Sequence, residues 1–255
     1  MFFHNNYTIY ALIATIFTWL LTMLGSSMVF FIKKINKNFM DASLGIASGI
    51  MMSASFWSLL NPAIETAKSL KQIAFLVVTV GFVFGGLFIF VTDKIFEKKL
   101  KTKNKRLSLL ILSITMHNIP EGLAVGIAFG SIKYGINGTT LTNAIMLALA
   151  IGLQNFPEGS AVSLPLRREG YSRFKSFLYG SLSAIVEPIS GLIGALLIIK
   201  IYSLMPLFLS FAAGAMIYVI IQELIPESQT NKNKSLMALF SLIGFSIMMI
   251  LDTAL

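Results

Sequence analysis

The chain has 255 residues, of which 56% are hydrophobic and only 12% are charged, and its mean hydropathy is +0.80. A water-soluble globular domain is nearer to a quarter charged, so this composition excludes such a domain and favours a bundle of membrane-spanning helices. The absence of cysteine excludes disulfides and thiolate metal ligands. We attribute the formal net charge of +9 to basic loops at a membrane surface and expect no nucleic-acid partner.

Eight apolar segments follow one another along the chain, each long enough to cross a bilayer core. They cover residues 9–32, 42–64, 72–92, 107–130, 141–166, 174–199, 204–225 and 235–255. Because the connections are short, we expect an all-α fold in which residues 1–255 form a single polytopic transmembrane domain. The N-terminal stretch MFFHNNYTIY has no basic region and no small-residue cleavage site, so the first segment is expected to be a retained span.

Basic residues are distributed unequally between the two sides of this predicted bundle. Sixteen lysines and arginines fall in or beside the connections after segments 1, 3, 5 and 7, whereas four fall on the opposite side. Basic residues are enriched in cytoplasmic loops, so the larger set is placed in the cytoplasm. With an even number of spans, both termini are then predicted to lie outside, and we expect a multi-pass protein of the cell (plasma or inner) membrane.

The fourth and fifth segments carry related motifs. HNIPEGLAV at 117–125 and QNFPEGSAV at 154–162 are identical at six of nine positions, at a constant offset of 37. Because the two segments are expected to cross the membrane in opposite directions, they are predicted to be an inverted-topology pair. A weaker similarity between ASGIM at 47–51 and AAGAM at 212–216 extends this pattern. Together they predict a 3 + 2 + 3 inverted-repeat arrangement of the eight spans.

Both motifs place polar side chains inside an apolar segment. These side chains are His117, Asn118 and Glu121 in the first motif, and Gln154, Asn155 and Glu158 in the second. The first and last member of each set are four residues apart, so they share one face of a helix, with the asparagine beside them. Pro120 and Pro157 lie between them and are expected to kink each helix and free a backbone carbonyl.

A third carboxylate, Glu187, precedes Pro188 in the sixth segment. Each ionised carboxylate in a bilayer core costs roughly 2.5 kcal/mol or more, so three of them require a common partner. A divalent cation is such a partner: histidine and carboxylates suit zinc or iron, and amide oxygens add harder ligands. Glu223 lies near the end of the seventh segment and Glu227 lies just beyond it; interfacial exposure and a role in an exit path are both open for these residues.

Three functions are compatible with these residues. The first is import of a divalent metal ion as substrate, with no cofactor. The second is a membrane metalloenzyme, which typically needs an HExxH pair or three histidine ligands, whereas His117 is the one histidine in a predicted span. The third is a proton or monovalent-cation carrier that uses the same carboxylates. We favour the first and expect no enzymatic activity.

HNIPEG at 117–122 together with QNFPEG at 154–159, on the fourth and fifth of eight segments, resembles the Zrt/Irt-like (ZIP) family of metal-ion transporters. ASFWSLLNPAIE at 54–65 and the VEPISG stretch resemble its bacterial, GufA-like branch. The resemblance covers nearly the whole chain. It implies a homodimeric transporter that moves Zn²⁺ into the cytoplasm by alternating access. Fe²⁺, Mn²⁺ and Cd²⁺ are the further substrates that the resemblance implies.

The resemblance also implies a binuclear metal site. One metal position would be formed by His117, Glu121, Gln154 and Glu158, and the other by Asn118, Asn155 and Glu187, with Glu121 and Glu158 bridging. QELIPE at 222–227 matches a family stretch near the cytoplasmic exit, which implies that role for Glu223 and Glu227. Three departures are visible: the loop between segments 3 and 4 has no histidine, Asn155 stands where some relatives have aspartate, and Gln222 stands where some have histidine.

Overall fold

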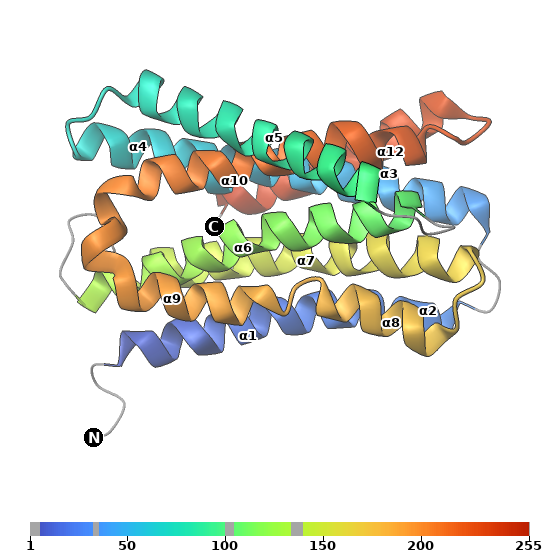
Figure 1. Cartoon of the computed structure of the whole chain (residues 1–255), viewed down its shortest axis with the longest axis horizontal. Helices are drawn as coiled ribbons and strands as arrows, with labels where there is room; N and C mark the ends of the chain where they lie inside the picture. The colour runs from blue at the N-terminus through green and yellow to red at the C-terminus, as the bar shows by residue number, and fades with distance from the viewer. Residues whose placement is uncertain (1–5, 33–35, 100–104, 134–139, 255) are drawn as a thin grey trace.

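The computed structural model describes residues 6–32, 36–99, 105–133 and 140–254, and within these ranges the regular structure is entirely helical (Figure 1). The longer helices lie side by side along the long axis of the molecule (Figure 1). In chain order the elements are α1 (Tyr7–Ser26), α2 (Met28–Phe31), α3 (Lys37–Ala54), η1 (Ser55–Leu60), α4 (Asn61–Ser69), α5 (Ala74–Lys99), α6 (Lys105–Lys133), α7 (Leu141–Arg168), α8 (Arg173–Leu182), α9 (Val186–Ile201), η2 (Tyr202–Leu204), α10 (Met205–Val219), η3 (Ile220–Leu224), α11 (Ile225–Ser228) and α12 (Lys234–Ala254). The predicted all-α class is confirmed.

Within the described part of the chain, six helical stretches are long and apolar enough to cross a membrane. They are Tyr7–Phe31, Lys37–Ser69, Ala74–Ile95, Arg173–Ile198, Tyr202–Ser228 and Lys234–Thr253. These stretches correspond to six of the eight predicted segments. The other two segments correspond to α6 and α7, which have 29 and 28 residues and carry the two polar motifs. At about 1.5 Å per residue, each of these two helices is nevertheless longer than a bilayer core is thick.

The helices respond to their prolines in different ways, and the kinks expected at Pro120 and Pro157 stay a prediction. α6 and α7 continue without a break through Pro120 and Pro157. Instead, π-helical turns η1 and η3 lie directly before Asn61-Pro62 and Ile225-Pro226. A proline lacks the N–H of the α-helical bond and crowds the carbonyl one turn earlier, and the wider π turn accommodates both effects. The sixth segment is broken between α8 and α9, just before Glu187-Pro188.

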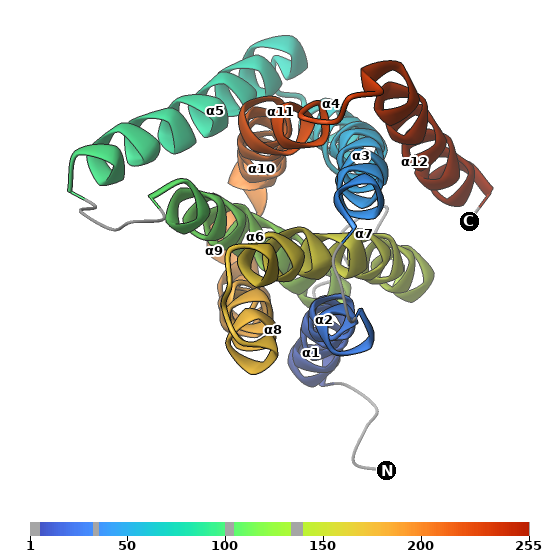
Figure 2. The same ribbon diagram turned by 90° about the vertical axis from the view of Figure 1, so that its right-hand side faces the viewer.

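The helices form two groups, which Figure 2 shows end-on. In the central group, α6 packs along α9 and α1 packs along α7; in the flanking group, α3 packs along α12 and α5 packs along α10. The two groups meet where α3 contacts α7 and α10 contacts α6. Small residues permit the close approach within each group: a Cβ on Gly126 would lie 2.0 Å from the Gly191 carbonyl oxygen, and one on Gly49 would lie 1.9 Å from that of Ser241.

Candidate metal centre

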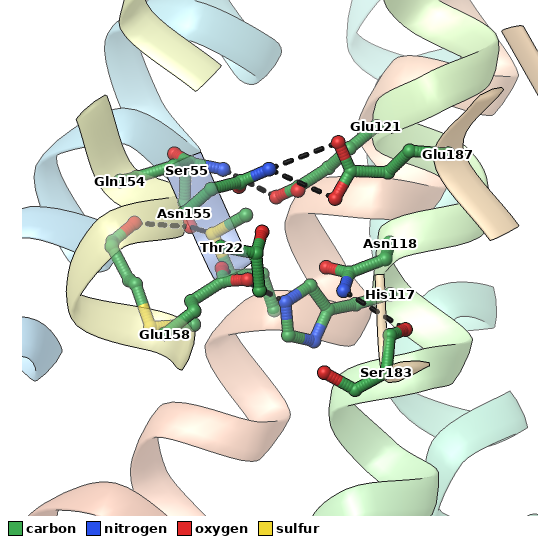
Figure 3. A network of polar contacts seen from close by, with 12 residues as sticks. Thr22, Ser55, His117, Asn118, Glu121, Gln154, Asn155, Glu158, Ser183 and Glu187 are labelled. Atoms are coloured by element: carbon green, nitrogen blue, oxygen red, sulfur yellow. Dashed lines mark hydrogen bonds and ion pairs between the residues drawn. The ribbon is translucent and has the colours of Figure 1, made fainter. Parts of the chain in front are cut away.

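The seven residues predicted as ligands gather in one buried cluster between α6, α7 and α9 (Figure 3). They are His117, Asn118, Glu121, Gln154, Asn155, Glu158 and Glu187, and none is more than 1% exposed. α6 and α7 each supply three of them, because the i, i+1 and i+4 spacing of each motif places its polar side chains toward the facing helix. α9 supplies Glu187 from its first turn.

The two motifs are joined by reciprocal contacts. His117 Nε2 lies 3.0 Å from Glu158 Oε1, so the first residue of the first motif contacts the glutamate of the second. Gln154 Nε2 donates a hydrogen bond to Glu121 Oε1, so the first residue of the second motif contacts the glutamate of the first. The same pairing therefore occurs twice, with histidine replaced by glutamine on one side.

The two asparagines are also anchored in equivalent ways. Asn118 Nδ2 donates to the carbonyl oxygen of Ser183, at the end of α8, over 3.2 Å. Asn155 Nδ2 lies 3.3 Å from the carbonyl oxygen of Thr18 on α1. It also lies 2.8 and 2.9 Å from the two carboxylate oxygens of Glu187. Each amide nitrogen is thus directed away from the space between the motifs and onto an acceptor of a neighbouring helix.

These contacts leave one ligand atom of each motif residue without a partner. The unpartnered atoms among the described residues include His117 Nδ1, Asn118 Oδ1, Glu121 Oε2, Gln154 Oε1, Asn155 Oδ1 and Glu158 Oε2. A buried polar atom left unpaired typically costs about 1–3 kcal/mol, so six in one place call for a partner. All three amides spend their N–H groups on the protein and keep the carbonyl oxygen free, which is the atom that binds cations.

Three of these residues already satisfy the distance requirement for a shared ion. His117, Glu121 and Glu158 each offer a ligand atom, and these atoms lie within 4.8 Å of one another. One imidazole and two carboxylates are a donor set that suits Zn²⁺ and Fe²⁺, and the free amide oxygens add harder ligands. The cluster can therefore accept a dehydrated divalent cation that would be costly to place elsewhere in an apolar bundle.

Glu187 differs from the other six residues. Both of its carboxylate oxygens accept hydrogen bonds, from Asn155 Nδ2 and from the hydroxyl of Thr18. In this conformation it is a partner of Asn155 and has no unpaired oxygen. Its prediction as a ligand of a second metal position stays a prediction.

Sequence reasoning did not identify three residues of this network, namely Thr18 and Thr22 on α1 and Ser183 between α8 and α9. Thr22 lies where α1 packs on α7, since a Cβ on Gly159 would lie 2.0 Å from the Thr22 carbonyl oxygen. Thr18 and Thr22 are fully buried and, with Thr15, form a row of polar residues at helical spacing in an otherwise apolar segment. That spacing was the available signal, whereas nothing in the sequence marks Ser183.

The two residues predicted for an exit path lie outside the buried cluster. Glu223 belongs to η3 and Glu227 to α11, and both are partly exposed. Glu227 Oε1 lies 3.1 Å from Arg168 Nη2 at the end of α7. This ion pair joins the flanking group to the central group at the end of the bundle where α7 and α11 meet.

Comparison with known proteins now assigns the family. The family model described as "ZIP Zinc transporter" matches residues 97–252. "Zinc transporter ZIP11" of Xenopus tropicalis is 38% identical over 96% of this chain and 97% of its own length. "Zinc transporter GufA" of Myxococcus xanthus is 32% identical over 96% of this chain and 98% of its own length, in agreement with the predicted GufA-like branch. "Zinc transporter ZIPB" of Bordetella bronchiseptica is 32% identical over 92% of this chain and 77% of its own length. The chain belongs to the ZIP zinc transporter family.

Proposed function

We propose that the chain imports divalent transition-metal ions into the cytoplasm, with Zn²⁺ as the principal substrate and Fe²⁺, Mn²⁺ and Cd²⁺ as competing ones. The relatives above are named as zinc transporters, a class distinct from enzymes. The observation that carries the proposal is the fully buried group of His117, Glu121 and Glu158, each of which offers a ligand atom within 4.8 Å of the other two. Each of the three residues also has a buried ligand atom without a hydrogen-bond partner. The ion is substrate, and no cofactor is required.

The ligands are assigned to two adjacent positions. His117, Glu121, Gln154 and Glu158 form the first, and Asn118, Asn155 and Glu187 form the second. Glu121 and Glu158 each use one carboxylate oxygen in the cross-contacts and keep the other free, which supports a bridging role for both. A mixed set of one nitrogen and several oxygens binds less tightly than a closed zinc site, which favours release after passage.

The proposed topology has eight spans in a 3 + 2 + 3 inverted repeat, formed by one domain over residues 1–255, with both termini outside. Two kinds of pairing support it. The packing of α1 on α7 corresponds to that of α9 on α6, and the packing of α3 on α12 corresponds to that of α10 on α5. The side-chain contacts of the two motifs also exchange with one another at the offset of 37 residues.

Transport is proposed to proceed by alternating access in a homodimer in the cell membrane. The central group contains all seven proposed ligands and would move relative to the flanking group. In support, the packing within each group is more extensive than the packing between them. Glu223 and Glu227 lie in the flanking group beside the end of α7, where an ion that leaves toward the cytoplasm would pass.

The test is zinc uptake by proteoliposomes that contain the Glu121→Ala variant. Removal of this carboxylate takes a shared anion from both metal positions, so uptake should be abolished while the protein still elutes as a folded species in size-exclusion chromatography. Glu169→Ala, an exposed glutamate just beyond α7, is the matched control and should transport normally. Undiminished zinc uptake by Glu121→Ala would contradict the site assignment.

A further inference from the structure

Thr18 of α1 is joined to two of the proposed ligand residues, although it belongs to neither motif. Its carbonyl oxygen lies 3.3 Å from Asn155 Nδ2, and its hydroxyl donates to Glu187 Oε2. Asn155 and Glu187 are themselves joined, so the three residues form a closed triangle that links α1, α7 and α9. All three side chains are fully buried.

The hydroxyl of Thr18 has a choice of acceptors. The carbonyl oxygen of Thr15, one turn earlier, lies 3.0 Å away, and a threonine in a helix commonly bonds to such a carbonyl. The contact to Glu187 Oε2 joins α1 to α9, whereas the contact to the Thr15 carbonyl oxygen stays within α1. The Glu187 contact is therefore the one by which Thr18 can position a residue of a neighbouring helix.

The consequence reaches Asn155. The amide nitrogen of Asn155 lies between both oxygens of Glu187, and this contact fixes which end of the amide faces the space between the motifs. With the nitrogen held there, Oδ1 stays unpartnered and available to an ion. Among the described residues, the donors to the Glu187 carboxylate are Asn155 and Thr18, so loss of the Thr18 hydroxyl leaves one donor to hold it.

In the part of the chain that the structure describes, the corresponding contact on the other side of the cluster has no such hydroxyl donor to a carboxyl group. Asn118 is anchored by the carbonyl oxygen of Ser183, and the hydroxyl of Ser183 bonds to Gly180 within its own segment, at 2.8 Å. There a main-chain acceptor is sufficient to orient the asparagine. Thr18 supplies the same main-chain acceptor and, in addition, a donor to the carboxylate.

We propose that Thr18 is a positioning residue of the metal centre: its hydroxyl holds Glu187 against Asn155, so that Asn155 presents its carbonyl oxygen to the ion. This inference rests on the proposed function, because it concerns the second metal position. Groups that orient metal ligands typically change metal affinity about 10- to 100-fold when they are removed.

The test compares Thr18→Val with Thr15→Val in the full-length protein. Both threonines are fully buried on α1, but among the described residues the Thr15 hydroxyl bonds to carbonyls of its own helix, those of Ala11 and Leu12. We measure zinc binding to the purified protein and the zinc dependence of uptake. Thr18→Val should weaken zinc binding and raise the KM for uptake about 10- to 100-fold. Thr15→Val should match the wild type, and Thr18→Ser should restore wild-type affinity.

Equal zinc affinity of Thr18→Val and Thr15→Val would overturn the inference. A Thr18→Ser protein that binds zinc as weakly as Thr18→Val would also overturn it, because the methyl group of Thr18, and not its hydroxyl, would then determine the affinity. Should Thr18→Val fail to fold, the same substitution is made in the Glu187→Gln protein, which lacks the carboxyl group that Thr18 contacts. There Thr18→Val should cause little further loss of zinc affinity. A loss as large as 10-fold in that background would show that Thr18 acts independently of Glu187.

The two proposals fail in different ways. A wild-type protein that neither binds nor takes up zinc would refute the proposed function. A wild-type protein that does both, beside a Thr18→Val protein equal to Thr15→Val, would refute only the role of Thr18.

Discussion

Gly159→Ala tests how closely the metal centre depends on the contact between α7 and α1. Gly159 immediately follows Glu158, and a Cβ at this position would lie 2.0 Å from the carbonyl oxygen of Thr22 and 2.8 Å from the amide nitrogen of Ser26. Both are main-chain atoms, which cannot rotate away. To restore ordinary contact, the two helices would have to separate by roughly 1.4 Å at this point.

Such a separation acts on stability and on the site together. Overpacking typically costs about 1–3 kcal/mol, and the better helix propensity of alanine returns about 0.5–1 kcal/mol, so the net destabilisation reaches at most about 2.5 kcal/mol. It would also lengthen the contact between Asn155 Nδ2 and the Thr18 carbonyl oxygen, now 3.3 Å. We therefore expect a lower unfolding temperature and a large loss of zinc uptake.

The matched control is Gly86→Ala on α5. A Cβ at Gly86 would meet its nearest neighbour, the Gly214 carbonyl oxygen, at 3.6 Å, which is ordinary contact. This variant gains helix propensity without a clash and should be at least as stable as the wild type. Thermal unfolding in detergent and zinc uptake are measured for both variants. If Gly159→Ala unfolds at the same temperature as Gly86→Ala and transports fully, the packing argument is wrong.

Three further predictions concern other contacts. His117→Gln replaces a nitrogen ligand by an amide oxygen, so uptake should continue while the competition order shifts from zinc toward manganese. Arg168→Glu places a like charge beside Glu227, with which Arg168 forms an ion pair of 3.1 Å, so zinc uptake should slow. The double variant Arg168→Glu/Glu227→Arg should restore uptake. The unfolding free energy should change by less than about 1 kcal/mol, because the pair is partly exposed. Asn231→Leu removes the donor 2.9 Å from Oδ2 of the buried Asp41 and should lower the unfolding free energy by about 1–3 kcal/mol.

Each of these has an outcome that contradicts it. An unchanged order of competing metals in His117→Gln would mean that the imidazole does not select the ion. For the ion pair, the control is Arg167→Gln, because the guanidinium of Arg167 donates to the nearby carbonyl oxygen of Tyr171. If Arg167→Gln slows zinc uptake as much as Arg168→Glu does, the effect of Arg168→Glu does not come from its specific pair with Glu227. Asn231→Leu with a wild-type unfolding temperature would show that Asp41 finds another donor.

The candidate site was predictable from the sequence because its residues share a spacing and occur twice. His117 with Glu121 and Gln154 with Glu158 each lie one helical turn apart, and the structure brings both pairs into the same buried cluster. Thr18 was not predictable in this way. A threonine in an apolar helix usually bonds to its own backbone, as Thr15 does, and only the packing of α1 against α9 distinguishes the two.

The fold was predictable in class but not in its irregularities. Apolar segments of bilayer length predict helices, and the long helices of the structure follow them. A proline predicts that a helix must adapt, but its neighbours decide where the strain is absorbed. α6 and α7 continue through Pro120 and Pro157, whereas Pro62 and Pro226 follow π-helical turns.

The central claim is that a divalent cation passes through the carboxylates of α6 and α7. Its most direct test is zinc uptake into proteoliposomes by the wild type and by Glu158→Ala, with Cd²⁺, Mn²⁺ and Fe²⁺ as competitors. We predict saturable uptake by the wild type and none above background in Glu158→Ala, because the variant loses both the contact to His117 and the free oxygen Oε2. Equal uptake by the two proteins would show that the paired motifs are structural and that the ion takes another path.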